Sequence, residues 1–225
     1  FYFNLMSPLF QFLILLTLFG SCNNSPDKGK DTLANFDTLS IPADSTVFYF
    51  DTKPDRKDTM ENALTMFVTT WYSKMLFALK EPILKNYQGN KEIYRFTWLR
   101  SYNHPVSIRL EKQGDLIKLF TKVSNGAGGY VPGDLILDKI TDVTLQEYYL
   151  LLEKIEETKF WSLPTEKVDA SSDGSEWIIE VAKNNRYHLV ARRSPFGERY
   201  GNFRIIGEYL ISLAKLDKKE TEKMY

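Results

Sequence analysis

The sequence has little of the chemistry on which many catalytic and structural sites depend. It contains one cysteine, Cys22, and two histidines, His104 and His188. A single cysteine leaves no pair for a disulfide and no cysteine cluster for a metal ion. The domain must therefore be held together by a packed core, and a chain of 225 residues is long enough to form one.

Neither sign of charge is in excess. The 29 Lys and Arg residues balance 29 Asp and Glu residues, so the formal net charge is zero. A neutral protein has no field that attracts nucleic acid or an anionic membrane surface. We therefore predict that nucleic acid is not a partner.

Motifs of common cofactor and catalytic sites are also missing. The glycine-rich stretch 124–133 lacks the Gly-Lys-Ser/Thr ending of a phosphate-binding loop, and no dinucleotide spacing occurs. This stretch is either a mobile turn or a flap over a ligand pocket. The sequence has no nucleophile elbow and no metal-ligand spacing around its histidines. We assign no catalytic residue, no metal ion and no cofactor.

The N-terminal segment is almost wholly apolar and uncharged over residues 1–19. The run 9–19 has the length of a signal-peptide hydrophobic region and is short for a membrane-spanning helix. Small residues, Gly20 and Ser21, stand directly before Cys22. This pattern resembles the lipobox of bacterial lipoproteins, in which signal peptidase II cuts before the cysteine and its thiol is diacylated.

The lipobox resemblance implies a lipoprotein signal peptide over 1–21 and a lipid anchor at Cys22. The protein would then be held in the cell envelope at a membrane, on the periplasmic or surface side of an outer membrane, with the bilayer as a partner. An acylated cysteine leaves no thiolate for catalysis. The alternatives are an uncleaved membrane anchor and a cytosolic protein.

Composition divides the rest of the chain. Residues 22–45 are rich in Asn, Ser, Asp, Lys, Thr and Pro, which predicts a flexible tether. We expect a single domain over 46–216 and a charged, disordered tail over 217–225. The segment 47–50 is either a short strand or a piece of chain that packs onto the domain.

Three amphipathic helices are expected. The first begins near Asp58, has apolar residues at helical spacing from Met60 to Leu79, and ends before Pro82. The second begins at a capping box of Thr144 and Glu147 and ends before Pro164. The third covers about 203–216.

The strands form one central segment and two hairpins. Segment 94–100 is apolar on both faces, so we place it in the middle of the sheet. Segments 106–110 and 116–123 form the first hairpin, in which Arg109 lies near Lys118 on a face that we expect to contact solvent. Together these elements predict an α+β fold, an antiparallel sheet of about five strands covered by about three helices.

The second hairpin, within 173–195, carries the candidate binding residues. Asn184 and Asn185 supply its turn, and a register follows in which Val181 lies opposite His188 and Trp177 lies opposite Arg192. The other face carries Glu176 and Glu180, for which surface ion pairs are expected. One interpretation is a polar sheet edge, and another is a pocket under the tryptophan. The candidate binding residues are Asp173, Glu176, Trp177, Tyr187, His188 and Arg192.

A second resemblance covers roughly residues 60–216. The motifs that carry it are Glu81-Pro82, Tyr94-Arg95-Phe96-Thr97-Trp98-Leu99-Arg100, Phe160-Trp161, Asp173-Gly174 with Trp177, and Tyr187-His188 with Arg192 and Ser194-Pro195. The set resembles an uncharacterised bacterial family, which supports the fold and implies no activity.

The sequence therefore favours a lipid-anchored module that binds a ligand or an envelope protein. The alternatives are an envelope hydrolase, with His188, Glu176 and Arg192 as its candidates, and a small-ligand-binding protein that uses the 173–195 hairpin. Replacement of His188 by alanine distinguishes these hypotheses, because it should abolish turnover by a hydrolase and leave partner binding elsewhere on the protein intact.

Overall fold

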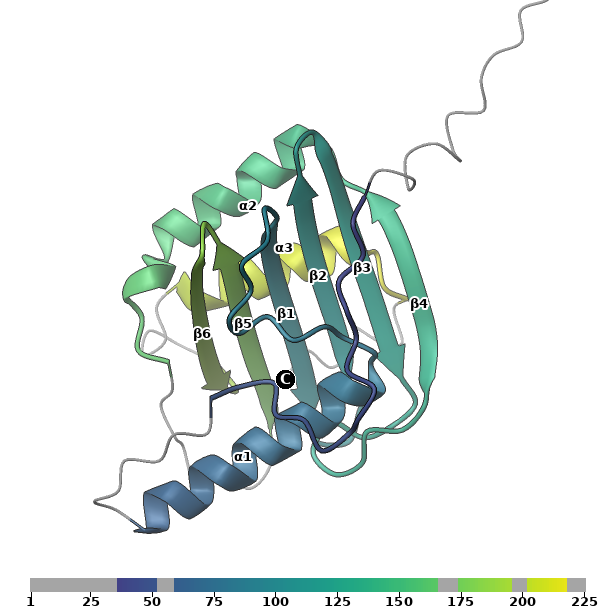
Figure 1. The fold of residues 1–225 in the computed structure, drawn as a ribbon, viewed down its shortest axis with the longest axis vertical. Helices are drawn as coiled ribbons and strands as arrows, with labels where there is room; N and C mark the ends of the chain where they lie inside the picture. Colours follow the sequence, from purple (N-terminus) through teal and green to yellow (C-terminus); the bar gives the residue numbers. More distant parts are fainter. Residues whose placement is uncertain (1–35, 52–58, 166–173, 196–201, 218–225) are drawn as a thin grey trace, which may run out of the picture. The chain divides into compact units, whose positions relative to one another are not determined.

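One antiparallel sheet organises the residues that the computed structural model describes, 36–51, 59–165, 174–195 and 202–217. Its strand order is β4-β3-β2-β1-β5-β6 (Figure 1). The strands are β1 (Glu92–Arg100), β2 (Val106–Gln113), β3 (Leu116–Ser124), β4 (Leu135–Asp142), β5 (Ser175–Lys183) and β6 (Arg186–Arg193). The helices are α1 (Thr59–Ala78), α2 (Leu145–Glu157) and α3 (Arg204–Ala214), with the short 3-10 helix η1 (Phe160–Ser162). The predicted α+β fold is confirmed, and the described sheet has six strands rather than about five.

The β5–β6 hairpin has the register predicted from its turn. Asn184 and Asn185 both adopt left-handed backbone conformations, with φ of 53° and 57°. Val181 pairs with His188, and Trp177 pairs with Arg192. Asparagine tolerates this conformation, which the right-handed twist of a two-residue hairpin requires.

Strand β1 is central, as its two apolar faces predicted. It pairs with β2 on one side and with β5 on the other. Strand β4 is the strand that sequence analysis missed. It lies at one edge of the sheet, and Ile136 and Ile140 are about half exposed there. Because both of its faces mix apolar and charged residues, the segment shows no clear alternation.

Helices α2 and α3 cover one face of the sheet and form the larger core with it. Trp177 lies within this core, 5.0 Å from Phe96 and 5.9 Å from Trp98 between ring centroids. Helix α3 approaches Trp177 closely at Gly207, where a Cβ atom would lie 2.7 Å from the indole ring. The absence of a side chain at Gly207 therefore allows the helix to pack against the tryptophan.

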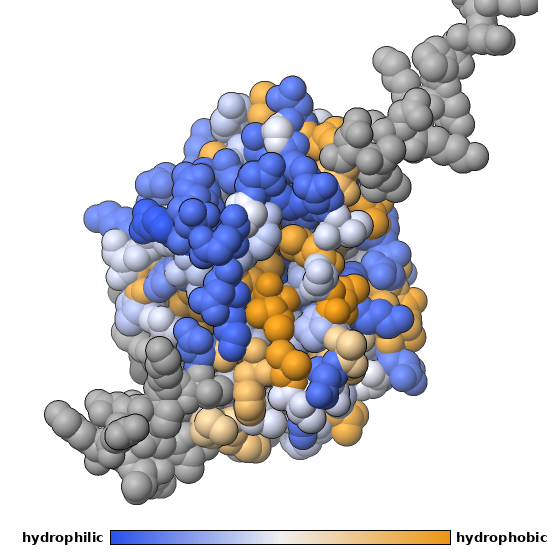
Figure 2. All heavy atoms as spheres, viewed as in Figure 1, coloured by the Kyte–Doolittle hydropathy of each residue, from blue (hydrophilic) through white to orange (hydrophobic). Residues whose placement is uncertain are grey.

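Helix α1 and the segment 36–51 cover the opposite face. Tyr72, Met75 and Leu76 of α1 pack with Tyr49 and Phe50 in a second apolar cluster. This confirms that 47–50 packs onto the domain. Figure 2 views the molecule from the α1 side and shows hydrophilic residues gathered over α2 and the β5–β6 turn, with hydrophobic residues near the centre and bottom.

The compact unit begins at Phe36, earlier than the boundary at residue 46 expected from composition. Phe36 is buried, with its ring centroid 6.2 Å from that of Phe120. Residues 1–35, including Cys22, and the tail after Asp217 lie outside the described residues. Within the described ranges, no helix combines the length and apolar character needed to cross a membrane.

The glycine-rich loop between β3 and β4 packs against the domain. The Trp71 indole N–H of α1 donates to the Gly128 carbonyl over 2.8 Å. A Cβ atom at Gly128 would lie 2.7 Å from the backbone of Arg100, so the loop backbone lies directly on β1. Glycine is needed for this close approach.

Candidate binding site

Charged side chains of neighbouring strands lie together on the α1 face of the sheet. Arg95 of β1 pairs in register with Arg109 of β2 and with Glu180 of β5. Residues two apart on a strand share a face, so Glu111 lies on the same side as Arg109. Each of these side chains is buried.

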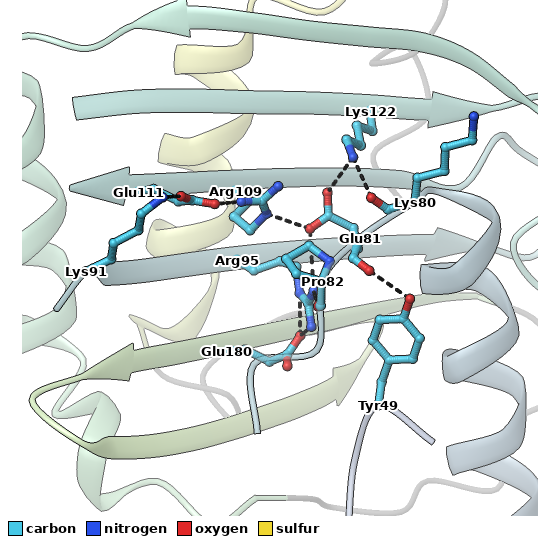
Figure 3. Close-up of polar contacts among 10 residues, drawn as sticks. All are labelled: Tyr49, Lys80, Glu81, Pro82, Lys91, Arg95, Arg109, Glu111, Lys122 and Glu180. Atoms are coloured by element: carbon cyan, nitrogen blue, oxygen red, sulfur yellow. Dashed lines mark hydrogen bonds and ion pairs between the residues drawn. The ribbon is translucent and has the colours of Figure 1, made fainter. Parts of the chain in front are cut away.

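Glu81 reaches this layer from the turn that ends α1. Lys80 adopts the left-handed conformation, with φ of 50°, and the Glu81 N–H donates to the Leu76 carbonyl over 3.0 Å. Such a turn satisfies the last carbonyls of a helix and reverses the chain. The Glu81 carboxylate then lies at the centre of the group drawn in Figure 3.

Three cations surround Glu81. Arg109 Nε donates to Glu81 Oε2 over 2.7 Å, and Arg95 Nη1 lies 3.4 Å from the same oxygen. Lys122 Nζ lies 3.7 Å from Glu81 Oε1. Burial acts to raise the pKa of Glu81, but Arg109, Arg95 and Lys122 outweigh it and hold the pKa below its ordinary value. The carboxyl is therefore ionised at neutral pH.

Arg95 joins this centre to a second carboxylate. Its Nε donates to Glu180 Oε2 over 2.6 Å, and its Nη1 donates to the Pro82 carbonyl over 2.6 Å. The Tyr187 hydroxyl donates to Glu180 Oε1 over 2.9 Å. Both oxygens of Glu180 thus have donors.

A third carboxylate extends the group toward the N-terminal segment. Lys91 Nζ lies 2.7 Å from Glu111 Oε2, and Arg109 forms an ion pair with the other oxygen of Glu111. The Lys91 ammonium also lies 3.8 Å from the centroid of the Phe36 ring. These contacts fasten the start of the domain to β2.

We call these seven residues the charge cluster, and none of their side chains is more than 5% exposed. They are Glu81, Lys91, Arg95, Arg109, Glu111, Lys122 and Glu180. Among the described residues, no group of three His, Cys, Asp or Glu side chains is arranged to hold a metal ion. The cluster is closed to a substrate, and its contacts hold α1 and the turn after it on the sheet.

The charge cluster corrects two predictions. Arg109 was expected on a solvent-facing surface, but it is buried and pairs in register with Phe120 rather than with a lysine. Glu176 and Glu180 were expected in surface ion pairs, and both are buried. The reason is that α1 covers the face whose polar alternation indicated solvent.

A pocket of about 320 Å³ lies beside the charge cluster, between α1, the chain at Asp51 and the edge strand β6. Its apolar lining comes from Phe50, Val68, Leu189 and Ala191. Its polar lining comes from Asp51, Thr69, Thr165 and His188. Walls that combine apolar side chains with polar groups are found in ligand sites.

Two tyrosines connect this pocket to buried carboxylates. Tyr187 and Tyr72 line the pocket, and their hydroxyls donate to Glu180 and Glu176, over 2.9 and 3.0 Å. Burial raises the pKa of Glu176 even though Tyr72 and Arg193 act against the rise. The two tyrosine rings thus form part of the pocket wall, and their hydroxyl groups are held by buried carboxylates.

His188 also lines the pocket, but its ring is held by structural contacts. Its Nε2 lies 2.9 Å from the Leu163 carbonyl oxygen. Its ring stacks on Trp161 and meets Phe160 edge-on. These contacts leave Nε2 engaged with the backbone rather than directed at a ligand.

Arg192 holds the neighbouring piece of backbone. Its Nη2 donates to the Pro164 carbonyl over 2.8 Å, and its Nη1 donates to the Ala191 carbonyl over 2.7 Å. The guanidinium lies 5.7 Å from the centroid of the Phe203 ring. Arg192 and His188 together fasten residues 163–165 against β6.

The remaining candidates lie away from the pocket lining. Trp177 shares a face with His188, as predicted, but it is fully buried in the α2–α3 core, and its indole N–H donates to Ser175 over 3.0 Å. Glu176 lies behind Tyr72. Asp173 and Cys22 lie outside the described residues. Of the six candidate binding residues, the structure places Tyr187 and His188 at the pocket.

Replacement of Arg192 by methionine should lower the free energy of unfolding by about 1–3 kcal/mol, because the Ala191 and Pro164 carbonyls lose a charged donor. The Ala191 amide, which donates to the Thr165 carbonyl over 2.8 Å, should exchange with solvent faster. Urea unfolding and amide hydrogen exchange measure both effects. Arg186→Met on the same strand is the control, since Arg186 is exposed. Equal effects of the two variants would contradict the role assigned to Arg192.

The partners that complete the pocket and the charge cluster were not predicted from the sequence. Glu81 stood only in a motif, and the α1 residues that line the pocket, Val68 and Thr69, lay within the first expected helix without a role of their own. The sequence did contain one indication that the polar face is buried. Three amphipathic helices are too many for one face of a single sheet, so at least one helix must cover the other face. Nothing in the local sequence indicates that Thr165 and Asp51 meet β6.

A comparison with protein-family models gives no match to this chain. A comparison with curated proteins also gives no match.

Proposed function

We propose that this protein is a lipid-anchored binding module of the cell envelope, and that it binds through the pocket beside β6. The pocket carries the proposal, because it joins apolar walls to polar groups beside the edge strand β6. Its volume of about 320 Å³ fits one or two large side chains or a small ligand. The ligand is a protein segment or a small molecule with an apolar group.

The proposed anchor rests on the sequence before the domain. The apolar run 9–19 and the small residues before Cys22 resemble a lipobox. A diacylated cysteine gives stable attachment, since each methylene buried in lipid contributes about 0.8 kcal/mol. The bilayer is then one partner, and the domain is presented on the periplasmic or surface side of an outer membrane.

A binding function is favoured over hydrolysis because the candidate catalytic side chains are held in contacts within the protein. A general base must be within hydrogen-bond reach of the proton that it removes. His188 Nε2 is engaged by the Leu163 carbonyl, and Glu176 is held between Tyr72 and Arg193. These contacts support the binding module over the hydrolase.

Blocking the pocket should abolish binding. Thr165 is exposed at the pocket, so Thr165→Trp places an indole there while the core is left intact. Thr46→Trp is the control, because Thr46 is also exposed but lines a different hollow. Each variant is purified from its own membranes after gentle solubilisation, and bound molecules are identified by mass spectrometry.

The expected result is a stoichiometric ligand or partner that is retained by wild type and Thr46→Trp and is lost from Thr165→Trp. Retention of the same molecule by all three proteins would contradict the proposed site. Unfolding curves of the three proteins should agree, which shows that loss of binding is not loss of fold.

Replacement of Cys22 by alanine should abolish labelling by a fatty-acid probe and release the protein from the membrane fraction. Ser25→Ala is the matched control and should keep both the label and the membrane attachment. Unchanged labelling of Cys22→Ala would exclude the lipid anchor at this residue and leave the pocket hypothesis untouched.

A further inference from the structure

The outer edge of β6 carries backbone groups that point away from the sheet at every second residue. Antiparallel pairs alternate between hydrogen-bonded and non-hydrogen-bonded positions. The Ser194 N–H donates to Ser175 of β5, whereas the Ala191 N–H donates outward to Thr165. Odd-numbered residues of β6 therefore direct their N–H and C=O groups outward, and these include Tyr187 and Leu189.

Only Ala191 has a backbone partner on that outer side among the described residues, the Thr165 carbonyl at 2.8 Å. Residues 163–165 thus begin to pair with β6 and are held there by Arg192 and His188. The outward groups of Tyr187 and Leu189 continue the same edge without a backbone partner in the described ranges. A paired edge is therefore started at Ala191, and within the described ranges it is not continued to Leu189 and Tyr187.

The side chains of these odd-numbered residues lie on the α1 face, where Tyr187, Leu189 and Ala191 line the pocket. In a pair of strands, directly opposite residues have their side chains on the same face. A residue paired with Leu189 from outside would therefore direct its side chain to the α1 face, beside the apolar walls formed by Val68 and Phe50.

We propose that the ligand of the pocket is an extended peptide segment that adds to β6 as a further strand. Its backbone pairs with Tyr187 and Leu189, and its apolar side chains, at alternate positions, enter the pocket. Strand addition takes affinity from main-chain hydrogen bonds and specificity from pockets for alternate side chains. This inference rests on the proposed function, because it names the class of ligand for the same pocket.

The test uses the capped peptide Ac-Thr-Leu-Thr-Leu-Thr-NH2, which places two leucines on one face of a strand, and amide hydrogen exchange read by NMR. In the free protein, the amides of Tyr187 and Leu189 should exchange quickly, and those of His188 and Val190 slowly. With peptide at ten times its Kd, exchange at Tyr187 and Leu189 should slow about tenfold. The amides of His188 and Val190 should change little, because they already donate to β5.

A pair of proline variants provides the control. Leu189→Pro removes an outward N–H of β6, which an edge strand tolerates, and it should abolish peptide binding. Ile140 occupies an outward position on β4. The Val143 N–H donates inward to the Ile117 carbonyl of the neighbouring strand β3, and backbone groups alternate in direction, so those of Ile140, three residues earlier, point outward. Ile140→Pro should therefore leave peptide binding unchanged. The exchange pattern of the wild-type protein remains decisive if either variant fails to fold.

Three results would overturn strand addition. One is peptide binding at the pocket with no slowing at Tyr187 and Leu189. Another is a protein that does not bind the peptide although Thr165→Trp abolishes binding of its native ligand. This result would leave the proposed function standing. The third is slowing at the same amides that grows with protein concentration without peptide, which assigns the edge to a second copy of this chain. Failure of the proposed function gives a different result, because the Thr165→Trp protein would then still retain the native ligand.

Discussion

Replacement of Glu81 by glutamine should lower the free energy of unfolding by about 3–5 kcal/mol, the cost of removing one partner from a buried ion pair. Arg109 and Arg95 would remain buried and would lose the carboxylate that lies 2.7 and 3.4 Å from them. Lys122 would lose its nearest carboxylate as well. Because Glu81 stands in the turn that ends α1, the loss should loosen this helix first.

Urea unfolding measures the effect, and Glu153→Gln is the control. Glu153 is exposed on α2, so its replacement should change stability by less than about 0.5 kcal/mol. A loss below about 1 kcal/mol for Glu81→Gln would show that the charge cluster does not depend on its central carboxylate.

The pH dependence provides a second readout on the same residue. The pKa of Glu81 in the folded protein lies below its ordinary value of 4.5, because Arg109, Arg95 and Lys122 outweigh the effect of burial. Its stabilising contribution is therefore present above pH 4.5 and is lost as the pH falls below that value. The Glu81→Gln variant should lose less stability than wild type over this acidic range.

Replacement of Trp177 by alanine should lower the free energy of unfolding by about 3–5 kcal/mol, because it leaves a large cavity in a buried core. Phe96, Trp98 and Gly207 all lie against the indole, and all are buried. This expectation follows from the place of Trp177 in the α2–α3 core, away from the pocket.

Trp161→Ala is the matched control for Trp177→Ala. Trp161 is only half-buried, so its loss should be clearly smaller in the same unfolding assay. Folded Trp177→Ala protein should keep its ligand affinity, since the residue does not line the pocket. A selective loss of binding without loss of stability would return Trp177 to the binding site.

Much of the fold could be predicted because its signals are local. The two asparagines at 184 and 185 determine the hairpin turn, and the turn fixes the register of every pair in β5 and β6. The capping box at Thr144 and Glu147 is present as expected, with Glu147 N–H donating to Thr144. Such features depend on a few residues that are neighbours in the sequence.

The charge cluster could not be predicted in the same way. Alternation on β2 shows which residues share a face with Arg109, but it does not show whether that face meets water or α1. The polar residues suggested solvent, and the tertiary structure placed a helix there instead. Burial of Arg109 depends on Glu81 and Glu111, and the former comes from a turn far away in the sequence.

The pocket depends even more on long-range packing. Asp51, Val68, Thr165 and Leu189 meet there from four separate parts of the chain. The sequence indicated His188 because a polar side chain shared a face of the hairpin with aliphatic ones. The same rule indicated Arg192, which instead holds the backbone of residues 163–165. A pocket was expected under Trp177, which instead lies in the core.

The central claim is that this protein binds its ligand in the pocket beside β6, and site-specific photocrosslinking tests it most directly. A benzophenone amino acid is placed at Thr165 in the full chain, and at Thr46 in a matched control. After illumination in native membranes, position 165 should give one dominant crosslinked product that excess soluble ligand competes away, and position 46 should not give it. The same product from both positions, or none from position 165 while the ligand still co-purifies, would contradict the claim.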